Sequence, residues 1–187
     1  MEIEEVIKKV INILDKLNIP YLLTGALSVV YYGEPRATHD IDLVIQIKED
    51  DITLLMKGFQ DNFFIDEESI RNALKERSMF NAVHKDTNFK VDFWILTEDK
   101  FNKEMFNRRV KRNILGIEIY LPTPEDVIIN KLEWFKMSNI DKHYYDALSV
   151  YCVQKDNLDI EYIKNCCKAK SILEIFERME EEIKKES

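Results

Sequence analysis

Cysteine, glycine and long apolar runs are all scarce in this chain of 187 residues. Its three cysteines form neither a CxxC motif nor a cysteine–histidine cluster with zinc-ligand spacing, so a zinc-binding fold is not expected. An odd cysteine count in a chain with 33% charged residues is typical of reduced thiols in the cytoplasm. No apolar run approaches the roughly 20 residues of a membrane span, and early acidic residues argue against a signal peptide. We therefore expect a cytoplasmic protein with no membrane contact.

Positive charge is also in the minority, because the formal net charge at pH 7 is −8. Such a balance argues against a protein that coats nucleic acid by bulk attraction. One local basic segment, "NRRVKRN" at residues 107–113, is the candidate for contact with nucleic acid or triphosphate. The solvated end of a helix is the alternative interpretation of this segment.

The hydrophobic pattern alternates between helical and strand periods up to about residue 121. The segment "IDLVIQI" at residues 41–47 is rich in β-branched residues and apolar on both faces, which is typical of a central strand. The pattern predicts helices over residues 3–17, 26–32, 50–62, 67–77 and 99–109, and strands over residues 21–23, 41–47, 79–84, 89–96 and 116–122.

The character of the chain changes at "PTPEDV", residues 122–127. Thr123 can cap a helix that has Pro124 at its first position, and every later segment has helical periodicity. We therefore divide the chain into an α/β core, residues 1–121, and a helical C-terminal region, residues 122–187. The expected fold class is α+β, with a mixed sheet and flanking helices in the core.

Two carboxylates, Asp40 and Asp42, stand at the beginning of the predicted central strand. Side chains two apart in a strand point to the same side, with Cα atoms roughly 7 Å apart. Carboxylates at that separation can converge on one or two divalent cations, and such ions stabilise the attacking and leaving oxygens of a phosphoryl displacement. The alternative is a strand end at which both acids meet solvent or cap a turn.

A third acid, Asp92, lies inside the apolar strand pattern "KVDFWIL". An ionised carboxylate in such a strand costs several kcal/mol unless it is paired or bound to a metal. A strand end, or an ion pair with a lysine such as Lys90, would also explain it. If its strand neighbours that of Asp40 and Asp42, the three carboxylates make a metal site plausible.

Gly25 ends one predicted strand and opens the next predicted helix. At such a junction the backbone N–H groups can approach phosphates closely, and the helix N-terminus favours an anion. A tight turn that needs glycine for geometry alone is the alternative. Lys131, in the largely apolar helix "VIINKLEWF", either extends to solvent or meets an anion.

Together these residues resemble the polymerase-beta-like nucleotidyltransferase superfamily. The likeness is carried by Gly25, by "GEPRATHDIDLVI" at residues 33–45 with its RxTxDxD pattern, and by the later Asp92. It is nearest to a small prokaryotic branch that includes the toxins of abortive-infection and type IV toxin–antitoxin systems. The helical segments 122–136 and 142–150 are similar to those of the same branch, so the likeness covers most of the chain.

The resemblance implies a metal-dependent transfer of a nucleoside monophosphate from an NTP to an acceptor hydroxyl, with release of pyrophosphate. The acceptor would be RNA, protein or a small molecule, and an antitoxin would be a further partner. Mg²⁺ (or Mn²⁺) would be bound by Asp40, Asp42 and Asp92, with Asp92 also acting as the general base. The nucleotide would be bound by Gly25, Ala26, Arg36, Thr38 and Lys131.

The sequence departs from the superfamily at the strand–helix junction, where Gly-Gly or Gly-Ser is usual and Gly25-Ala26 stands here. Ala26 retains the backbone N–H but lacks a hydroxyl group. This departure motivates a second hypothesis, a non-catalytic nucleotide sensor or protein-binding module with the same fold. Metal-dependent phosphohydrolysis, which uses the same acids without an acceptor, is a third.

Overall fold

The computed structural model describes residues 2–114 and 116–186 and divides them into two units. The first unit contains the chain up to Leu27 and the segment Ala37–Leu121, and the second contains Ser28–Arg36 and the chain from Pro122 onwards. The sequence-based division after residue 121 did not include Ser28–Arg36 in the second part.

The first unit is built on a five-stranded mixed sheet with strand order β1-β2-β5-β4-β3. Strands β2 and β5 are parallel, and the other neighbours pair antiparallel. The predicted α+β class with a mixed sheet is therefore confirmed. The strands are β1 (Tyr21–Thr24), β2 (Ile41–Ile45), β3 (Phe63–Phe64), β4 (Met79–His84) and β5 (Lys90–Ile95).

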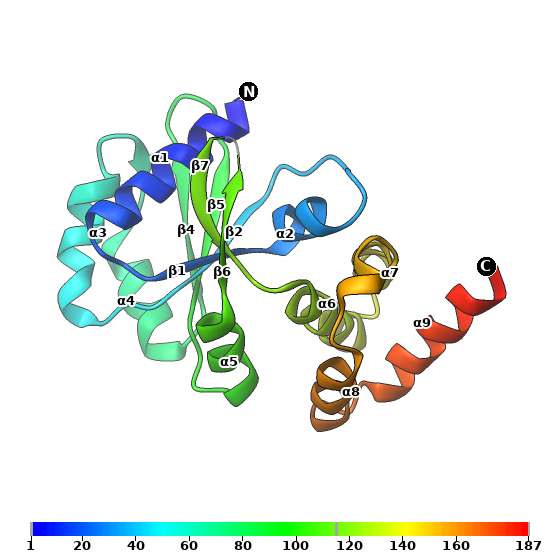
Figure 1. The fold of residues 1–187 in the computed structure, drawn as a ribbon. Coiled ribbons are helices and arrows are strands. Elements are labelled where there is room, and N and C mark those ends of the chain that lie inside the picture. Colours follow the sequence, from blue (N-terminus) through cyan, green and yellow to red (C-terminus); the bar gives the residue numbers. More distant parts are fainter. Residues whose placement is uncertain (1, 115, 187) are drawn as a thin grey trace. The chain divides into compact units, whose positions relative to one another are not determined.

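Helices cover one face of this sheet (Figure 1). The ring of Phe59 on α3 packs edge-on against Phe93 of β5, with 5.5 Å between centroids. Because side chains alternate along a strand, Phe93 lies on the face opposite to its neighbour Asp92. The helix α3 thus packs on the apolar face, and the acids lie on the opposite one. The helices of this unit are α1 (Glu2–Lys16), α3 (Ile52–Phe59), α4 (Glu67–Glu76) and α5 (Lys100–Arg108), with a 3₁₀ turn η1 (Glu49–Asp51).

A two-stranded hairpin, β6 (Val110–Ile114) and β7 (Ile117–Leu121), completes the first unit. Strand β7 was predicted, but β6 was not, because its three central residues are exposed and charged or polar and give no apolar alternation. The helix α5 ends at Arg108, so interpreting the whole basic segment 107–113 as a helix end is wrong from Val110 onwards.

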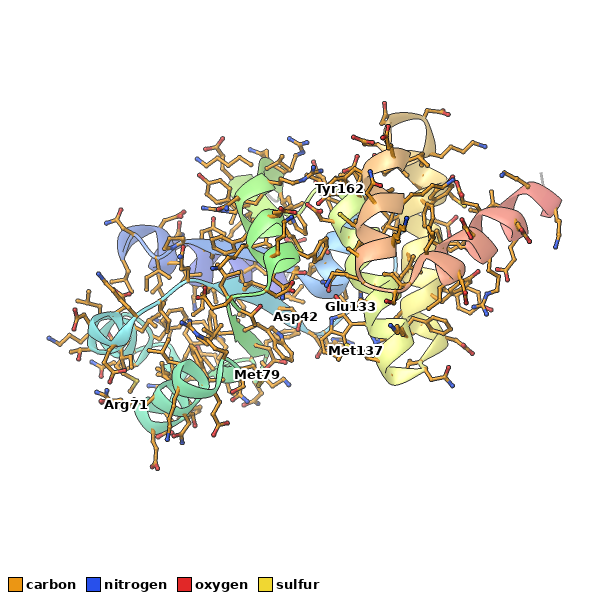
Figure 2. The ribbon with its side chains drawn as sticks, turned by 90° about the horizontal axis from the view of Figure 1, so that it is seen from below. Asp42, Arg71, Met79, Glu133, Met137 and Tyr162 are labelled. Atoms are coloured by element: carbon orange, nitrogen blue, oxygen red, sulfur yellow. The ribbon has the colours of Figure 1, made fainter. Side chains whose placement is uncertain are left out.

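The second unit consists of helices and the loops between them, with no strand among its described residues. Thr123 caps its first long helix, because its side chain accepts a hydrogen bond from the backbone N of Asp126. Figure 2 labels Glu133 of that helix, whose carboxylate accepts hydrogen bonds of 2.8 and 2.7 Å from Lys170 Nζ. No helix among the described residues has the length and apolar composition needed to cross a membrane. The helices are α6 (Pro124–Ser138), α7 (Asp141–Gln154), α8 (Ile160–Ala169) and α9 (Leu173–Glu186), with a 3₁₀ turn η2 (Lys155–Asn157).

Specific contacts with α7 explain why Ser28–Arg36 belongs to the second unit. The helix α2 (Gly25–Tyr32) ends in this segment. The backbone N of Glu34 donates to Ser149 Oγ at 2.7 Å, and Gln154 Nε2 donates to the carbonyl of Tyr32 at 2.8 Å. These bonds join residues more than 110 positions apart, so no local pattern could have predicted them.

Candidate active site

The face of the sheet opposite to Phe93 carries a row of polar side chains across four strands. The strand register pairs Thr24 with Asp42, Asp42 with Asp92, and Asp92 with Asn81. Neighbouring strands are roughly 4.8 Å apart, so each side chain of this polar row adjoins the next. Asp42, labelled in Figure 2, is half-buried, and Asp92 is only 9% exposed. The structure therefore brings two of the three predicted acids together.

The third predicted acid, Asp40, lies one residue before β2 and is exposed. Its backbone N donates to Thr38 Oγ1 at 3.4 Å. Within the described ranges no group of three or more histidine, cysteine or acidic side chains is arranged to hold a metal ion. The two adjacent acids, Asp42 and Asp92, are thus the centre of the candidate site, with Asp40 at its margin. The predicted alternation is confirmed, since the buried apolar side chains are Ile41, Leu43 and Ile45.

Lys90 supplies the positive charge of the polar row. Its Nζ lies 2.9 Å from Asp92 Oδ2, so the ion pair considered from the sequence is present. The hydrogen bond to Asp92 raises the pKa of Lys90 above its ordinary value of 10.5; burial opposes this, and the charges of Asp92, Asp40 and Asp42 add to it. The ammonium group is therefore under the influence of all three carboxylates.

The other oxygen of Asp92, Oδ1, differs from Oδ2 in having no partner among the described residues. Asp92 Oδ1 is buried and accepts no hydrogen bond from any residue that the structure describes. A buried acceptor without a partner costs about 1–3 kcal/mol, so such groups call for a ligand or another explanation. One oxygen of Asp92 is thus held by Lys90, while the other can accept a proton or bind a cation.

Gly25 lies directly against Asp42. Its φ is +66°, and a Cβ built on it would lie 2.1 Å from Asp42 Oδ2. Both the backbone conformation and the lack of space therefore require glycine here. Gly25 also begins α2, and the first N–H groups of a helix have no partner within the helix and favour anions. The predicted proximity of this junction to the acids is confirmed, and the buried Ala26 follows it.

The second unit holds the other two residues that we expected to bind the nucleotide. Arg36 donates to Asp146 through Nε at 2.9 Å and through Nη2 at 3.0 Å, and Lys131 Nζ donates to Asp146 Oδ2 at 2.8 Å. Asp146 is only 4% exposed. Burial raises its pKa, but the hydrogen bonds from Arg36 and Lys131 outweigh burial and bring the pKa below the ordinary value of 3.8.

Lys131 therefore meets an anion rather than solvent, and that anion belongs to the chain itself. Both oxygens of Asp146 are engaged by cations, in contrast to Asp92. The nearby His143 has a pKa below 6.5, chiefly because of burial and then because of Lys131. This ion cluster of Arg36, Lys131 and Asp146 explains how a buried lysine is tolerated.

A family model described as aminoglycoside-2''-adenylyltransferase matches residues 6–140, well over half of the chain. The chain belongs to this family. It is accordingly a nucleotidyltransferase, and the predicted superfamily is confirmed. The association with toxin–antitoxin systems stays a prediction.

Solved structures show the fold of this nucleotidyltransferase in other proteins. ANT(2'')-Ia in complex with adenylyl-2''-tobramycin is 12% identical, with a TM-score of 0.62 over 91% of this chain and 98% of that one. An antigenic nucleotidyltransferase-like protein from Paracoccidioides brasiliensis is 17% identical, with a TM-score of 0.59 over 91% of each chain. The lincomycin-bound lincosamide antibiotic adenylyltransferase LnuA is 11% identical, with a TM-score of 0.53 over 82% of this chain and 98% of that one. A comparison with curated proteins finds no match.

Two members of the polar row of this nucleotidyltransferase, Thr24 and Asn81, could not be predicted from the sequence pattern. Neither residue has a spacing to the acids that marks it in the sequence. Only the register between strands places them beside Asp42 and Asp92. Lys90 was considered only as an ion-pair partner, although its position two residues before Asp92 put it on the same face of the strand.

Proposed function

We propose that this nucleotidyltransferase is metal-dependent and transfers a nucleoside monophosphate from an NTP to a hydroxyl group of a small molecule, releasing pyrophosphate. The observation that carries this proposal is the pairing of Asp42 with Asp92 beside Gly25, with the buried Asp92 Oδ1 left without a partner among the described residues. The family model and the folds of ANT(2'')-Ia and LnuA support a small-molecule acceptor. Aminoglycosides and lincosamides are therefore the first acceptor classes to test.

The residues of the polar row fit Mg²⁺ or Mn²⁺. These ions are bound by one or two carboxylates together with phosphate oxygens of the substrate, and Asp42 and Asp92 supply the carboxylates. Asp40, exposed and one residue before β2, is the proposed third ligand. A cation bound there would neutralise charge that develops on the phosphoryl oxygens during transfer.

The beginning of α2 is the proposed phosphate-binding element of the first unit. Its first residue, Gly25, lies against Asp42 and is followed by Ala26, and Thr38 lies two residues before Asp40. In the second unit, the ammonium group of Lys131 has three N–H donors. One of them is used in the hydrogen bond to Asp146 Oδ2. We include Arg36 and Lys131 in the proposal as further contacts of the nucleotide.

Asp92 is the proposed general base. Its Oδ1 would accept the proton of the acceptor hydroxyl, whose oxygen forms the new bond to the α-phosphorus. The bond from the α-phosphorus to the oxygen that bridges to the β-phosphate breaks, and pyrophosphate leaves with that electron pair. Most of the rate enhancement in such transfers comes from positioning and from charge stabilisation.

A transfer assay tests this function. Purified protein is incubated with Mg²⁺, each of the four α-³²P NTPs in turn, and a panel of aminoglycosides and lincosamides. We expect label on at least one acceptor, and a loss of about 100-fold or more in Asp42→Asn and in Asp92→Asn. Asp61→Asn, which changes an exposed acid in the turn after α3, is the matched control and should retain activity.

Two results would contradict the proposal. Undiminished transfer by Asp92→Asn would remove that residue from the chemistry. Labelling of RNA or protein, with no label on any small molecule, would overturn the proposed acceptor class while leaving the transfer reaction in place.

A further inference from the structure

We propose that Lys90 is a positioning residue, an internal counter-ion that holds Asp92 in place and competes with the divalent cation for the carboxylates of the polar row. Lys90 would thereby set how tightly this enzyme binds its metal. This inference rests on the proposed function, because it concerns the same carboxylates.

The ammonium group of Lys90 contacts a carboxylate of the polar row directly. Lys90 and Asp92 are two residues apart on β5 and therefore on the same face of the sheet. The Nζ lies 2.9 Å from Oδ2, a direct charge-assisted hydrogen bond. The side chain of Lys90 is 47% exposed, so it can move to another rotamer without disturbing the core.

The ammonium group of Lys90 interacts with more than one carboxylate of the candidate site. Asp42 adjoins Asp92 in the sheet, and the charges of both Asp40 and Asp42 act on the Lys90 ammonium. One positive charge therefore faces three negative ones. A divalent cation that binds Asp42 and Asp92 is repelled by this ammonium and must share Asp92 with it.

The ion pair of Lys90 with Asp92 differs from the ion cluster around Asp146. In the second unit, both oxygens of Asp146 are held by cations from the chain, Arg36 and Lys131. In Asp92, Lys90 holds Oδ2 only, and the buried Oδ1 has no partner among the described residues. A carboxylate that is oriented through one oxygen, and whose other oxygen is buried without a partner, gains stability when a proton or a cation binds that oxygen.

Manganese binding to the nucleotide-free protein tests the inference without any activity measurement. The signal of unbound Mn²⁺ in electron paramagnetic resonance gives the affinity of the wild type and of Lys90→Met, Lys90→Arg and Lys57→Met. Lys57→Met is the matched control, since it removes one positive charge at an exposed position of α3. We expect Lys90→Met to bind Mn²⁺ about fivefold more tightly or better, because a nearby unit charge is removed. Lys90→Arg and Lys57→Met should stay close to the wild type.

Thermal unfolding provides a second readout. In EDTA, Lys90→Met should melt below the wild type, because its carboxylates have lost their counter-ion, and Mn²⁺ should raise its Tm by more than it raises that of the wild type. If the wild type binds Mn²⁺ clearly and Lys90→Met binds it no more tightly, the inference about Lys90 is wrong, while the proposed metal site stands. If no variant binds Mn²⁺, the proposed metal site is wrong and the inference fails with it.

Discussion

Gly25 and Asp42 lie so close together that a Cβ at position 25 would be 2.1 Å from the Oδ2 atom of Asp42. The missing side chain of one residue thus leaves the space that the carboxylate of the other occupies. The junction between β1 and α2 and the acid on β2 are therefore one structural feature, although 16 residues of sequence lie between them.

Gly25→Ala should disrupt the site. The substitution places a Cβ in the left-handed region of φ, which costs about 1–2 kcal/mol, and it also displaces Asp42. Gly116→Ala is the matched control, because Gly116 has a φ of +79° but nothing within 4 Å of its Cβ position. Urea unfolding and the transfer assay should show a greater loss of stability in Gly25→Ala, and a loss of activity there alone. Equal losses of stability in both variants, with activity retained, would show that Asp42 has room to move.

Much of this site could be predicted from local pattern. The alternation of Ile41, Leu43 and Ile45 with Asp42 follows from the two-residue period of a strand, and the structure has it. Whether Asp92 was a metal ligand or an ion-pair partner could not be decided, because the choice depends on the register between β2 and β5. The structure shows the ion pair on one oxygen of Asp92, and the other oxygen is buried without a partner among the described residues.

The second unit shows the limits of local pattern more strongly. The partner of Lys131 is 15 residues away on the next helix, and Arg36 joins the same carboxylate from 110 residues away. Strand β6 was missed for the opposite reason, since its short-range pattern is polar and only its pairing with β7 makes it a strand.

Asp146→Ala should destabilise the second unit by about 3–5 kcal/mol, because it leaves the buried Lys131 with no counter-charge. The double variant Lys131→Met, Asp146→Ala should recover part of this loss, since it removes the unpaired charge. Glu118→Ala, which breaks the exposed pair between Lys111 and Glu118, is the control and should cost far less. Chemical denaturation measures all three. A double variant no more stable than Asp146→Ala would contradict the assigned role of Lys131.

Stability should fall as the pH falls below about 6.5, in part because of His84. This histidine is 3% exposed, and Lys9 Nζ lies 3.0 Å from its Nε2. Since an ammonium only donates, Nε2 accepts, and Nδ1 carries the proton toward Thr87 Oγ1 at 3.0 Å. Burial and then Lys9 lower the pKa of His84 below 6.5, while Asp86 and Glu5 oppose the shift.

The unfolded chain therefore binds more protons than the folded one as the pH drops through 6.5, and stability is lost there. His84→Gln should show a weaker decline of the unfolding free energy between about pH 7 and pH 5 than the wild type. His39→Gln, which changes an exposed histidine, is the control variant. His143 is present in the wild type and in both variants, so its own contribution cancels from each comparison. Parallel profiles for His84→Gln and the wild type would show that His84 is not a source of the decline.

The most direct test of the proposed catalytic site is a crystal grown with Mn²⁺ and an NTP analogue whose α–β bridge cannot be cleaved. Anomalous scattering locates the manganese without reference to any assumed ligand. The account predicts a peak within coordination distance of Asp42 and Asp92, with the triphosphate at the beginning of α2. Manganese and triphosphate bound elsewhere, with Asp42 and Asp92 contacting neither, would contradict it.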